Sequence, residues 1–401
     1  MDWGRFLNRA WKCFYTKKKN REEKTFSFLY FFANDYSRRL GIIEYHLKRN
    51  DYKFGKWEAL FVPKKGGGNR PLVIPSMIRD KIVLKAISDY LSEVLSQEFH
   101  HVRSISYAYQ KGRNTREALI QLKKIHQPGN VLLKMDIRHF FDEIDKNILM
   151  QLIDRYAIDK YVKILIYNAI NPSIDFSKIK DSELEMFPKG GIPQGNPISA
   201  VLSNLYLLEL DNWALSEGWK MVRYADDMVF SVSSLKEALV ILKRVEKYLS
   251  YNRKLTIHPL EYSADAKTFI SQDPKKNNIK YLGVIFDGKN LYPTQECCEI
   301  LTRKIKSILR GLSTPKEKEI DIKKAISQWC GYYAFTDIAM SQMNYIDNKI
   351  NYWIRKSKLN ICEFYIADVI KRVRKRQNRK ITKIFRPMQF GDDFKWLNIY
   401  G

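Results

Sequence analysis

The segment Met221-Val-Arg-Tyr-Ala-Asp-Asp-Met-Val-Phe230 places two adjacent carboxylates, Asp226 and Asp227, inside an otherwise apolar run. Val, Tyr, Met and Phe favour strands, so an acidic pair in their midst predicts a tight hairpin with the acids at the bend. Neighbouring negative charges repel each other, and each is costly to bury unless a cation neutralises it. The segment therefore predicts a divalent-metal site. A solvated Asp-Asp turn is the alternative, because Asp is also a favoured turn residue.

The composition of the whole chain indicates a polyanionic partner. Its 401 residues carry a net charge of +26, and 45% of them are hydrophobic, which allows two or three packed units. Such an excess of positive charge favours nucleic acids or anionic surfaces as partners. No run of 18 or more apolar residues occurs, so no membrane-spanning helix and no membrane partner are predicted.

The cysteines bear on the compartment in which the protein works. Five are present, an odd number, and none forms a C-x-x-C pair, which argues against a zinc module and against a disulfide framework. Residues 1–21 also lack the apolar core of a signal peptide. The sequence therefore predicts a reduced, cytoplasmic protein.

Periodicity predicts a mixture of helices and strands up to about residue 290 and helices beyond it. The expected strands are 57–63, 71–75, 131–136, the 221–230 hairpin and 280–286, the last with a turn. The expected helices are 27–47, 76–97, 115–126, 145–168, 200–213, 234–252, 297–310, 321–339 and 345–356. Near the end, residues 371–380 contain seven basic residues in ten, which predicts either a phosphate-binding helix or a solvated end.

Six motifs, in this order along the chain, resemble those of the reverse transcriptase family. They are residues 60–75, 106–113, 134–142, 191–199 with 203–204, 224–227 and 281–283. The resemblance covers roughly residues 55 to 355. It implies an α+β chain with the right-hand polymerase fold, in which a palm with an antiparallel sheet lies between fingers and a helical thumb. The implied domains are a helical N-terminal extension (1–55), fingers (56–130), palm (131–290), thumb (291–360) and a basic C-terminal tail (361–401).

This resemblance implies an RNA-directed DNA polymerase that works by two-metal nucleotidyl transfer. Asp136, which ends an apolar strand, would act with Asp226 and Asp227 as the catalytic carboxylates. These three side chains and the backbone carbonyl of Ile137 would bind two Mg²⁺ ions, which Mn²⁺ can replace, because a hard ion needs few protein oxygens. For Asp136 the alternative is a helix N-cap.

The resemblance also implies residues that bind the incoming deoxynucleotide. Lys64, Lys65 and Arg70, on a basic turn, would contact its triphosphate. Phe141 would lie beneath the sugar, where a 2′-hydroxyl would clash with the ring, and this argues against an RNA-dependent RNA polymerase. Gln194 would lie beside the nucleotide and the template base. The alternatives are a solvated turn for the basic residues, core packing for Phe141 and a solvent-facing loop position for Gln194.

Tyr281, Leu282 and Gly283 would form the primer grip of such an enzyme. A lysine would donate a proton to the leaving pyrophosphate, and Lys267 and Lys254 compete for this role because the local spacing departs from the family pattern.

Some polar residues near these motifs have simpler interpretations. His258 is expected to be structural. Asp142, Glu143 and Asp145 are expected on solvated turns or helix starts.

Within the family, the chain is most similar to the bacterial group II intron-like branch. Its segments 326–333 and 346–353 resemble the thumb of that branch. Intron-encoded members usually continue into a DNA-binding region and an endonuclease, and this sequence does not. We therefore expect a stand-alone enzyme similar to those associated with phage defence. Its expected partners are dNTPs, a cDNA product and an RNA template, expected to be a structured non-coding RNA. The alternative is an intron-type maturase that binds structured RNA. The priming mode and the oligomeric state are left open.

Overall fold

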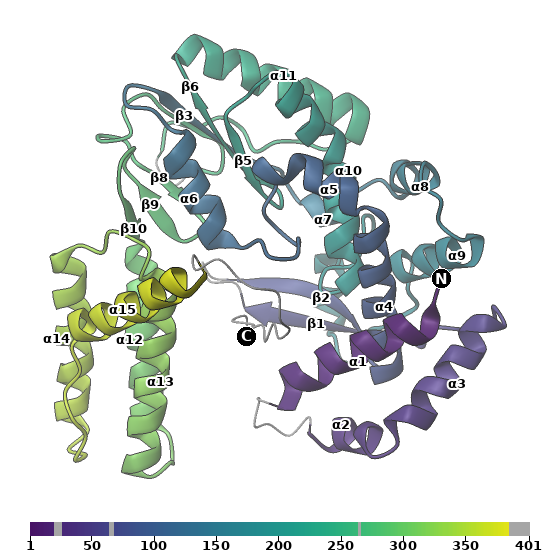
Figure 1. Ribbon diagram of the computed structural model, residues 1–401, viewed down its shortest axis with the longest axis horizontal. Helices are drawn as coiled ribbons and strands as arrows, with labels where there is room; N and C mark the ends of the chain where they lie inside the picture. The colour runs from purple at the N-terminus through teal and green to yellow at the C-terminus, as the bar shows by residue number, and fades with distance from the viewer. Residues whose placement is uncertain (20–25, 64–67, 264–265, 385–401) are drawn as a thin grey trace. The chain divides into compact units, whose positions relative to one another are not determined.

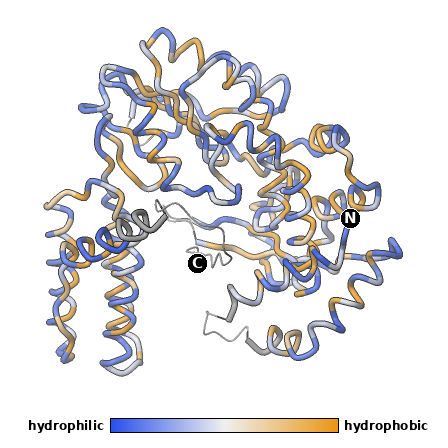
Figure 2. Tube along the Cα trace, viewed as in Figure 1, coloured by the Kyte–Doolittle hydropathy of each residue, from blue (hydrophilic) through white to orange (hydrophobic). Residues whose placement is uncertain are grey.

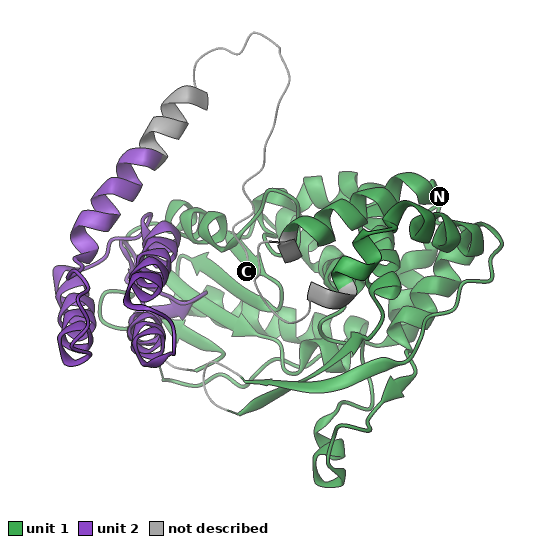
Figure 3. Cartoon of the chain, turned by 90° about the horizontal axis from the view of Figure 1, so that it is seen from below, with its two compact units in different colours: residues 1–277 green, residues 278–401 purple. Residues whose placement is uncertain are grey.

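The computed structural model describes residues 1–19, 26–63, 68–263 and 266–384, with backbone alone over 17–19, 26–28 and 377–384. The chain divides into two compact units, residues 1–277 and residues 278–401, and each is described by itself (Figure 3).

The first unit holds the following elements (Figure 1): helices α1 (Trp3–Lys19), α2 (Phe26–Ala33), α3 (Tyr36–Lys48), α4 (Ile78–Val94), α5 (Ser96–His101), α6 (Thr115–Ile125), α7 (Phe140–Glu143), α8 (Lys146–Asp154), α9 (Lys160–Ile170), α10 (Pro197–Ser216) and α11 (Leu235–Arg253), the short 3₁₀ helices η1 (Val102–Ser104) and η2 (Asp181–Met186), and strands β1 (Trp57–Pro63), β2 (Asn69–Pro75), β3 (Val131–Asp136), β4 (Ile174–Asp175), β5 (Met221–Tyr224), β6 (Asp227–Val232) and β7 (Phe269–Ser271).

A four-stranded antiparallel sheet forms the centre of this unit. Its order is β5-β6-β3-β7, and α11 packs against β3 and β6 while α6 contacts β5 (Figure 1). Every residue of β3 is buried, as expected for an almost continuous apolar run with neighbours on both sides. Hydrophobic residues concentrate where the elements of this unit pack together (Figure 2). The strand therefore ends on a buried acid, Asp136, between its two neighbouring strands.

A second sheet is built on a long hairpin. β1 and β2 pair antiparallel from Trp57 opposite Pro75 to Pro63 opposite Asn69, and β4 adds parallel to β1. The predicted nucleotide-binding residues Lys64 and Lys65 lie outside the described residues. Helix α4 follows β2 and packs against both α1 and α10.

Two helices predicted as continuous are each divided into two. The segment 27–47 forms α2 and α3, and the segment 145–168 forms α8 and α9. In the second case the cause is local capping: the Asp159 carboxylate accepts from the N–H groups of Tyr161 and Val162, which starts a new helix at α9. Apolar spacing continues across both breaks, so periodicity alone could not reveal them. Strands β4 and β7 were also missed.

The second unit contains a three-stranded sheet and four helices. Its elements are β8 (Ile279–Tyr281), β9 (Val284–Phe286), β10 (Leu291–Pro293), α12 (Gln295–Arg310), α13 (Pro315–Tyr333), α14 (Met340–Lys356) and α15 (Ile366–Ile384). Leu282 and Gly283 form the two-residue turn between β8 and β9, both with positive φ (50° and 77°), the conformation that such hairpin turns favour. The basic run 371–380 lies within α15, where the Arg374 guanidinium donates to the carbonyls of Ala334 and Thr336.

Two expectations from composition can be compared with the described residues. All five cysteines are free thiols in the structure. Among the described helices, none combines the length and the apolar character that a membrane span requires. The five-part domain division stays a prediction.

Candidate active site

The three predicted catalytic carboxylates lie at the ends of neighbouring strands. Asp136 is the last residue of β3 and is paired directly with Asp227, the first residue of β6. Asp226 lies in the two-residue turn between Tyr224 and Asp227. The predicted hairpin is therefore present, and the sheet register places Asp136 next to it.

A buried arginine holds the turn that carries Asp226. Ala225 has φ 58°, a left-handed conformation that costs a residue with a Cβ about 1 kcal/mol. Arg223, 1% exposed, donates from Nη1 to the Ala225 carbonyl at 2.8 Å and from Nη2 to Ser106 Oγ at 2.8 Å. Its Nε donates to Asp211 Oδ1 at 2.7 Å, and Asp211 is equally buried. Sequence reasoning missed this pair, although an arginine inside an apolar strand was a visible signal.

Burial and mutual repulsion disfavour the charged form of the two hairpin acids. Burial, followed by the negative charge of Asp136, raises the pKa of Asp226 to about 6. The same two causes raise the pKa of Asp227 to about 7, although the positive charge of Lys134 opposes them. A divalent cation among these oxygens would relieve both penalties.

A lysine ammonium lies against the first carboxylate. Lys267 Nζ is 2.8 Å from Asp136 Oδ2. Burial works to lower the pKa of Lys267, but the hydrogen bond and charge of Asp136 raise it overall, which keeps the side chain protonated. The competing candidate, Lys254, instead pairs with Asp145 Oδ2 at 2.6 Å. Of the two lysines, Lys267 is thus the one beside the catalytic aspartates.

His258 and Ile137 fix the backbone beyond Asp136. The His258 N–H donates to the Asp136 carbonyl at 3.0 Å, while its ring Nε2 is 3.9 Å from Asp136 Oδ2. Ile137 forms an isolated bridge with Ile257. These contacts support the structural interpretation of His258.

The carboxylates of Asp136, Asp226 and Asp227 are of the kind that binds a hard divalent ion, although their oxygens do not converge on one ion position in the structure. In the described part of the chain, no three His, Cys, Asp or Glu side chains are already arranged to hold a metal ion. The available donors are nevertheless carboxylate oxygens with unfavourable charge, and one of them already contacts a cation. Such oxygens are the ligands that Mg²⁺ and Mn²⁺ prefer.

The short helix α7, which follows Asp136 in the chain, is hydrogen-bonded to the loop before α10. This loop, residues 190–196, contains Gly190, Gly191 and Gly195 and is called the glycine-rich loop. The Ile192 N–H donates to the Phe141 carbonyl at 2.8 Å. Gly191 has φ 67°, and a Cβ there would lie 2.1 Å from the same carbonyl oxygen, so this position requires glycine. Phe141 is half-buried against the core and Phe140 is fully packed in it.

Gln194 links this clamp to the hairpin of β1 and β2. Its Nε2 donates to Asp142 Oδ1 at 3.0 Å, and its carbonyl accepts from the Val73 N–H at 3.3 Å. Asp142 was expected on a solvated turn or a helix start; it lies in the first turn of α7, and its contact with Gln194 was missed.

Arg70 and Tyr109 approach the aspartates from two other segments. The positive charge of Arg70 acts to lower the pKa of Asp226. Burial, followed by the charge of Asp226, raises the pKa of Tyr109, whose φ is 57°. The preceding carbonyl, that of Ala108, accepts from Asn204 Nδ2 at 2.7 Å. Sequence reasoning quoted the motif containing Tyr109 but gave this residue no role.

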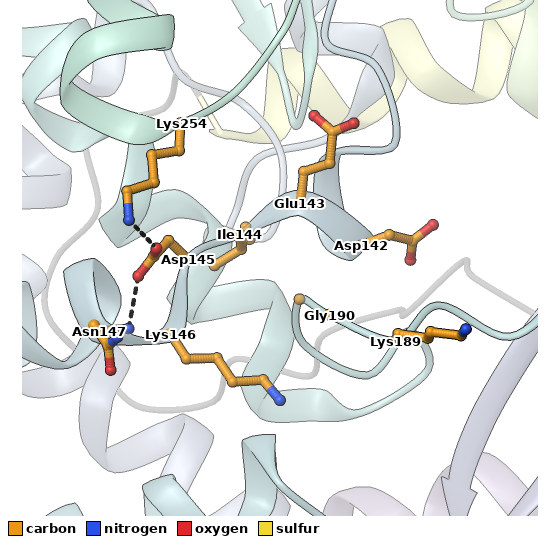
Figure 4. Close-up of a pocket in the computed structure, with 10 residues that line it drawn as sticks. Asp142, Glu143, Ile144, Asp145, Lys146, Asn147, Lys189, Gly190 and Lys254 are labelled. Atoms are coloured by element: carbon orange, nitrogen blue, oxygen red, sulfur yellow. Dashed lines mark hydrogen bonds and ion pairs between the residues drawn. The ribbon is translucent and has the colours of Figure 1, made fainter.

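A cavity of about 380 Å³ adjoins the α7 turn and is lined by residues 142–147, 189–191 and Lys254 (Figure 4). Its charged lining residues largely pair with neighbours: Lys254 with Asp145, and Glu143 with Thr256. Asp145 is the N-cap of α8, as expected for a helix start.

Comparison with known proteins decides the family. The model of the family described as reverse transcriptase (RNA-dependent DNA polymerase) matches residues 62–286, more than half of the 401 residues. The chain belongs to the reverse transcriptase family. Its α+β architecture is the right-hand polymerase fold, and this prediction is confirmed.

The relatives of this reverse transcriptase include proteins of the predicted branch. The group II intron-encoded protein LtrA of Lactococcus lactis subsp. cremoris is 26% identical over 239 residues, 59% of this chain and 36% of that protein. The Ec83 retron reverse transcriptase of Escherichia coli is 26% identical over 172 residues, 43% of this chain and 51% of that protein. The matches thus span about half or less of these relatives. They confirm the resemblance to group II intron-like enzymes.

Among solved structures, apo telomerase from Candida tropicalis aligns with a TM-score of 0.48 and 12% identity, over 84% of this chain and 67% of that one. This match is too distant to support any inference about the reverse transcriptase.

Proposed function

We propose that this reverse transcriptase is an RNA-directed DNA polymerase that extends a primer with deoxynucleotides along an RNA template. The observation that carries the proposal is the direct pairing of Asp136 with Asp227, with Asp226 in the adjoining turn. Family membership supports the same activity.

Asp136, Asp226 and Asp227, with the backbone carbonyl of Ile137, would hold two Mg²⁺ ions, or Mn²⁺ in their place. When bound, two such ions stabilise the charge that builds on the attacking and leaving oxygens of a phosphoryl transfer. Lys267 would donate its proton to the leaving pyrophosphate, a role supported by its contact with Asp136.

The surrounding residues would select and orient the substrates. Arg70 would bind the triphosphate, together with Lys64 and Lys65. The Phe141 ring would exclude a 2′-hydroxyl, and Gln194 would contact the nucleotide and the template base. The clamped α7 turn supports these assignments because it gives both residues defined positions.

In the second unit, Tyr281, Leu282 and Gly283 would steady the primer end. The left-handed conformation of Leu282 supports this, because such conformations in residues with a Cβ cluster at functional sites. The net charge of +26 would supply salt-dependent affinity for the RNA template and the cDNA product.

For the biological role we propose a cytoplasmic enzyme that copies a dedicated, structured non-coding RNA in anti-phage defence. The resemblance to defence-associated enzymes and the similarity to a retron reverse transcriptase support this role. Sequencing the cDNA made in cells tests it, because one dominant cDNA start and template are expected. A broad mixture of cellular templates would contradict a dedicated RNA.

A second candidate function is binding of structured RNA in the manner of an intron maturase. The similarity to a group II intron-encoded protein and the basic run of residues 371–380 in α15 favour it. Under this alternative, replacing Asp226 and Asp227 with Ala would leave the biological activity unchanged. Under the polymerase proposal the same change would abolish it.

A further inference from the structure

Asp142 and Gln194 form a contact between two motifs that are far apart in the sequence. Gln194 Nε2 donates to Asp142 Oδ1 at 3.0 Å, and both side chains are half-buried. A carboxylate accepts hydrogen bonds and does not donate them. The Gln194 amide must therefore turn its NH₂ group towards Asp142, which leaves its Oε1 and its second N–H for another partner.

The same short turn also fixes the residue next to Asp142. The Phe141 carbonyl accepts from Ile192, two residues before Gln194, and Gly191 packs closely on this turn. The backbone contact and the Asp142 side chain thus join α7 to the glycine-rich loop at two points. Any movement of this loop relative to α7 would shift Gln194 and Phe141 together.

Neighbouring acids have other partners. Glu143 Oε2 accepts from Thr256 Oγ1 at 3.2 Å, and Asp145 caps α8 and pairs with Lys254. Figure 4 shows the Asp142 and Glu143 side chains pointing in different directions from the turn. Asp142 is therefore the acid of this group that acts on Gln194.

We propose that Asp142 is a positioning residue for nucleotide selection: it fixes the orientation of the Gln194 amide and couples it to the Phe141 turn. The proposal rests on the polymerase function proposed above. An amide of fixed orientation can recognise a nucleotide with less loss of side-chain freedom, and its coupling to the Phe141 turn would hold the ring that excludes a 2′-hydroxyl.

A double-mutant cycle tests this proposal. Asp142→Ala, Gln194→Ala and the double variant are compared in primer extension, with kcat and KM for dNTPs measured separately and with NTPs as competitors. We expect Asp142→Ala to raise the dNTP KM about tenfold, the scale of a hydrogen bond to a charged group, and to reduce discrimination against NTPs. In the Gln194→Ala background the same change should have almost no effect. Asp142→Asn should restore most of the loss, because its Oδ1 can still accept from Gln194.

Glu143→Gln is the matched control, since Glu143 adjoins Asp142 on the turn but contacts Thr256. Independent, multiplicative effects of the two alanine changes would overturn the proposal, as would an effect of Asp142→Ala no larger than that of Glu143→Gln. Affinity for a non-hydrolysable dNTP, measured by fluorescence with Mg²⁺, distinguishes failure of the polymerase proposal from failure of the positioning role of Asp142. A wild type that binds it but never extends a primer contradicts the polymerase, whereas equal affinity in Asp142→Ala contradicts the positioning role.

Discussion

Asp136 of β3 and Asp227 of β6 are directly opposite residues of one antiparallel ladder. The five preceding residues of β3 are buried and pair with β6 residues that are buried too, so the apolar pattern fixes this register. A slip by one residue would turn every side chain of β3 to the opposite face of the sheet. The hydrophobic core thus holds two like charges next to each other, at a cost in stability that a bound cation can offset.

The hairpin acids should make the protein sensitive to divalent metal. Mg²⁺ at about 100 times its dissociation constant should stabilise the wild type by about 2.7 kcal/mol, because it binds only the folded chain. In Asp226→Asn/Asp227→Asn this stabilisation should be lost, and the metal-free variant should melt above the metal-free wild type. Thermal unfolding with and without Mg²⁺ measures both effects. Asp154→Asn, a change at an exposed acid, serves as the control; equal stabilisation of all three proteins would refute the metal site.

Phe141 should determine the choice of sugar. Phe141→Val removes most of the ring, so the preference for dNTPs over NTPs should fall by about tenfold or more. Competition between dCTP and CTP in single-nucleotide extension measures the ratio. Assays well below the melting temperature of the variant avoid effects of lost packing. An unchanged ratio would mean that Phe141 serves only the core.

Arg223 and Asp211 should be indispensable for the hairpin turn. Asp211→Ala leaves the Arg223 charge buried without its carboxylate, which should cost about 3–5 kcal/mol of unfolding free energy. The exposed Arg244–Glu217 pair offers a matched comparison, and Glu217→Ala should change little. Calorimetric melting of both variants measures the loss of unfolding free energy. Similar losses in the two would show that the buried pair stabilises the fold no more than the exposed one.

Gly191 and Gly190 should respond differently to alanine. At Gly191 the new Cβ would meet the Phe141 carbonyl at 2.1 Å in a left-handed backbone, and we expect a loss of at least about 2 kcal/mol with most of the activity. At Gly190 the nearest atom is 3.3 Å away, so the neighbour needs to shift only slightly. Melting temperatures and extension rates of the two variants test this difference. Equal tolerance at both positions would contradict the clamp between the loop and α7.

Much of the palm could be predicted from local pattern. The 131–136 strand was predicted with its observed bounds, because an apolar run that ends in an acid marks both ends of a strand. Asp226 and Asp227 were also correctly predicted at the bend of the 221–230 hairpin. The register of Asp136 with Asp227 needed the family resemblance, since no local rule joins residues so far apart.

Other contacts could not be predicted because they depend on tertiary packing. The partners of Arg223 come from α10, the 106 segment and the turn itself, and Asp142 finds Gln194 only when α7 meets the glycine-rich loop. The break between α8 and α9 was missed for a different reason: the Asp159 cap starts a new helix without interrupting the apolar spacing.

Primer extension by the full chain tests the central claim most directly. A 5′-labelled primer annealed to RNA, with dNTPs and Mg²⁺, should be extended by the wild type, and removal of the metal with EDTA should stop the reaction. Asp226→Ala/Asp227→Ala should extend nothing while it remains folded and still binds the primed RNA. Extension that survives this double change, or a folded wild type that extends no primer on any RNA template, would contradict the account.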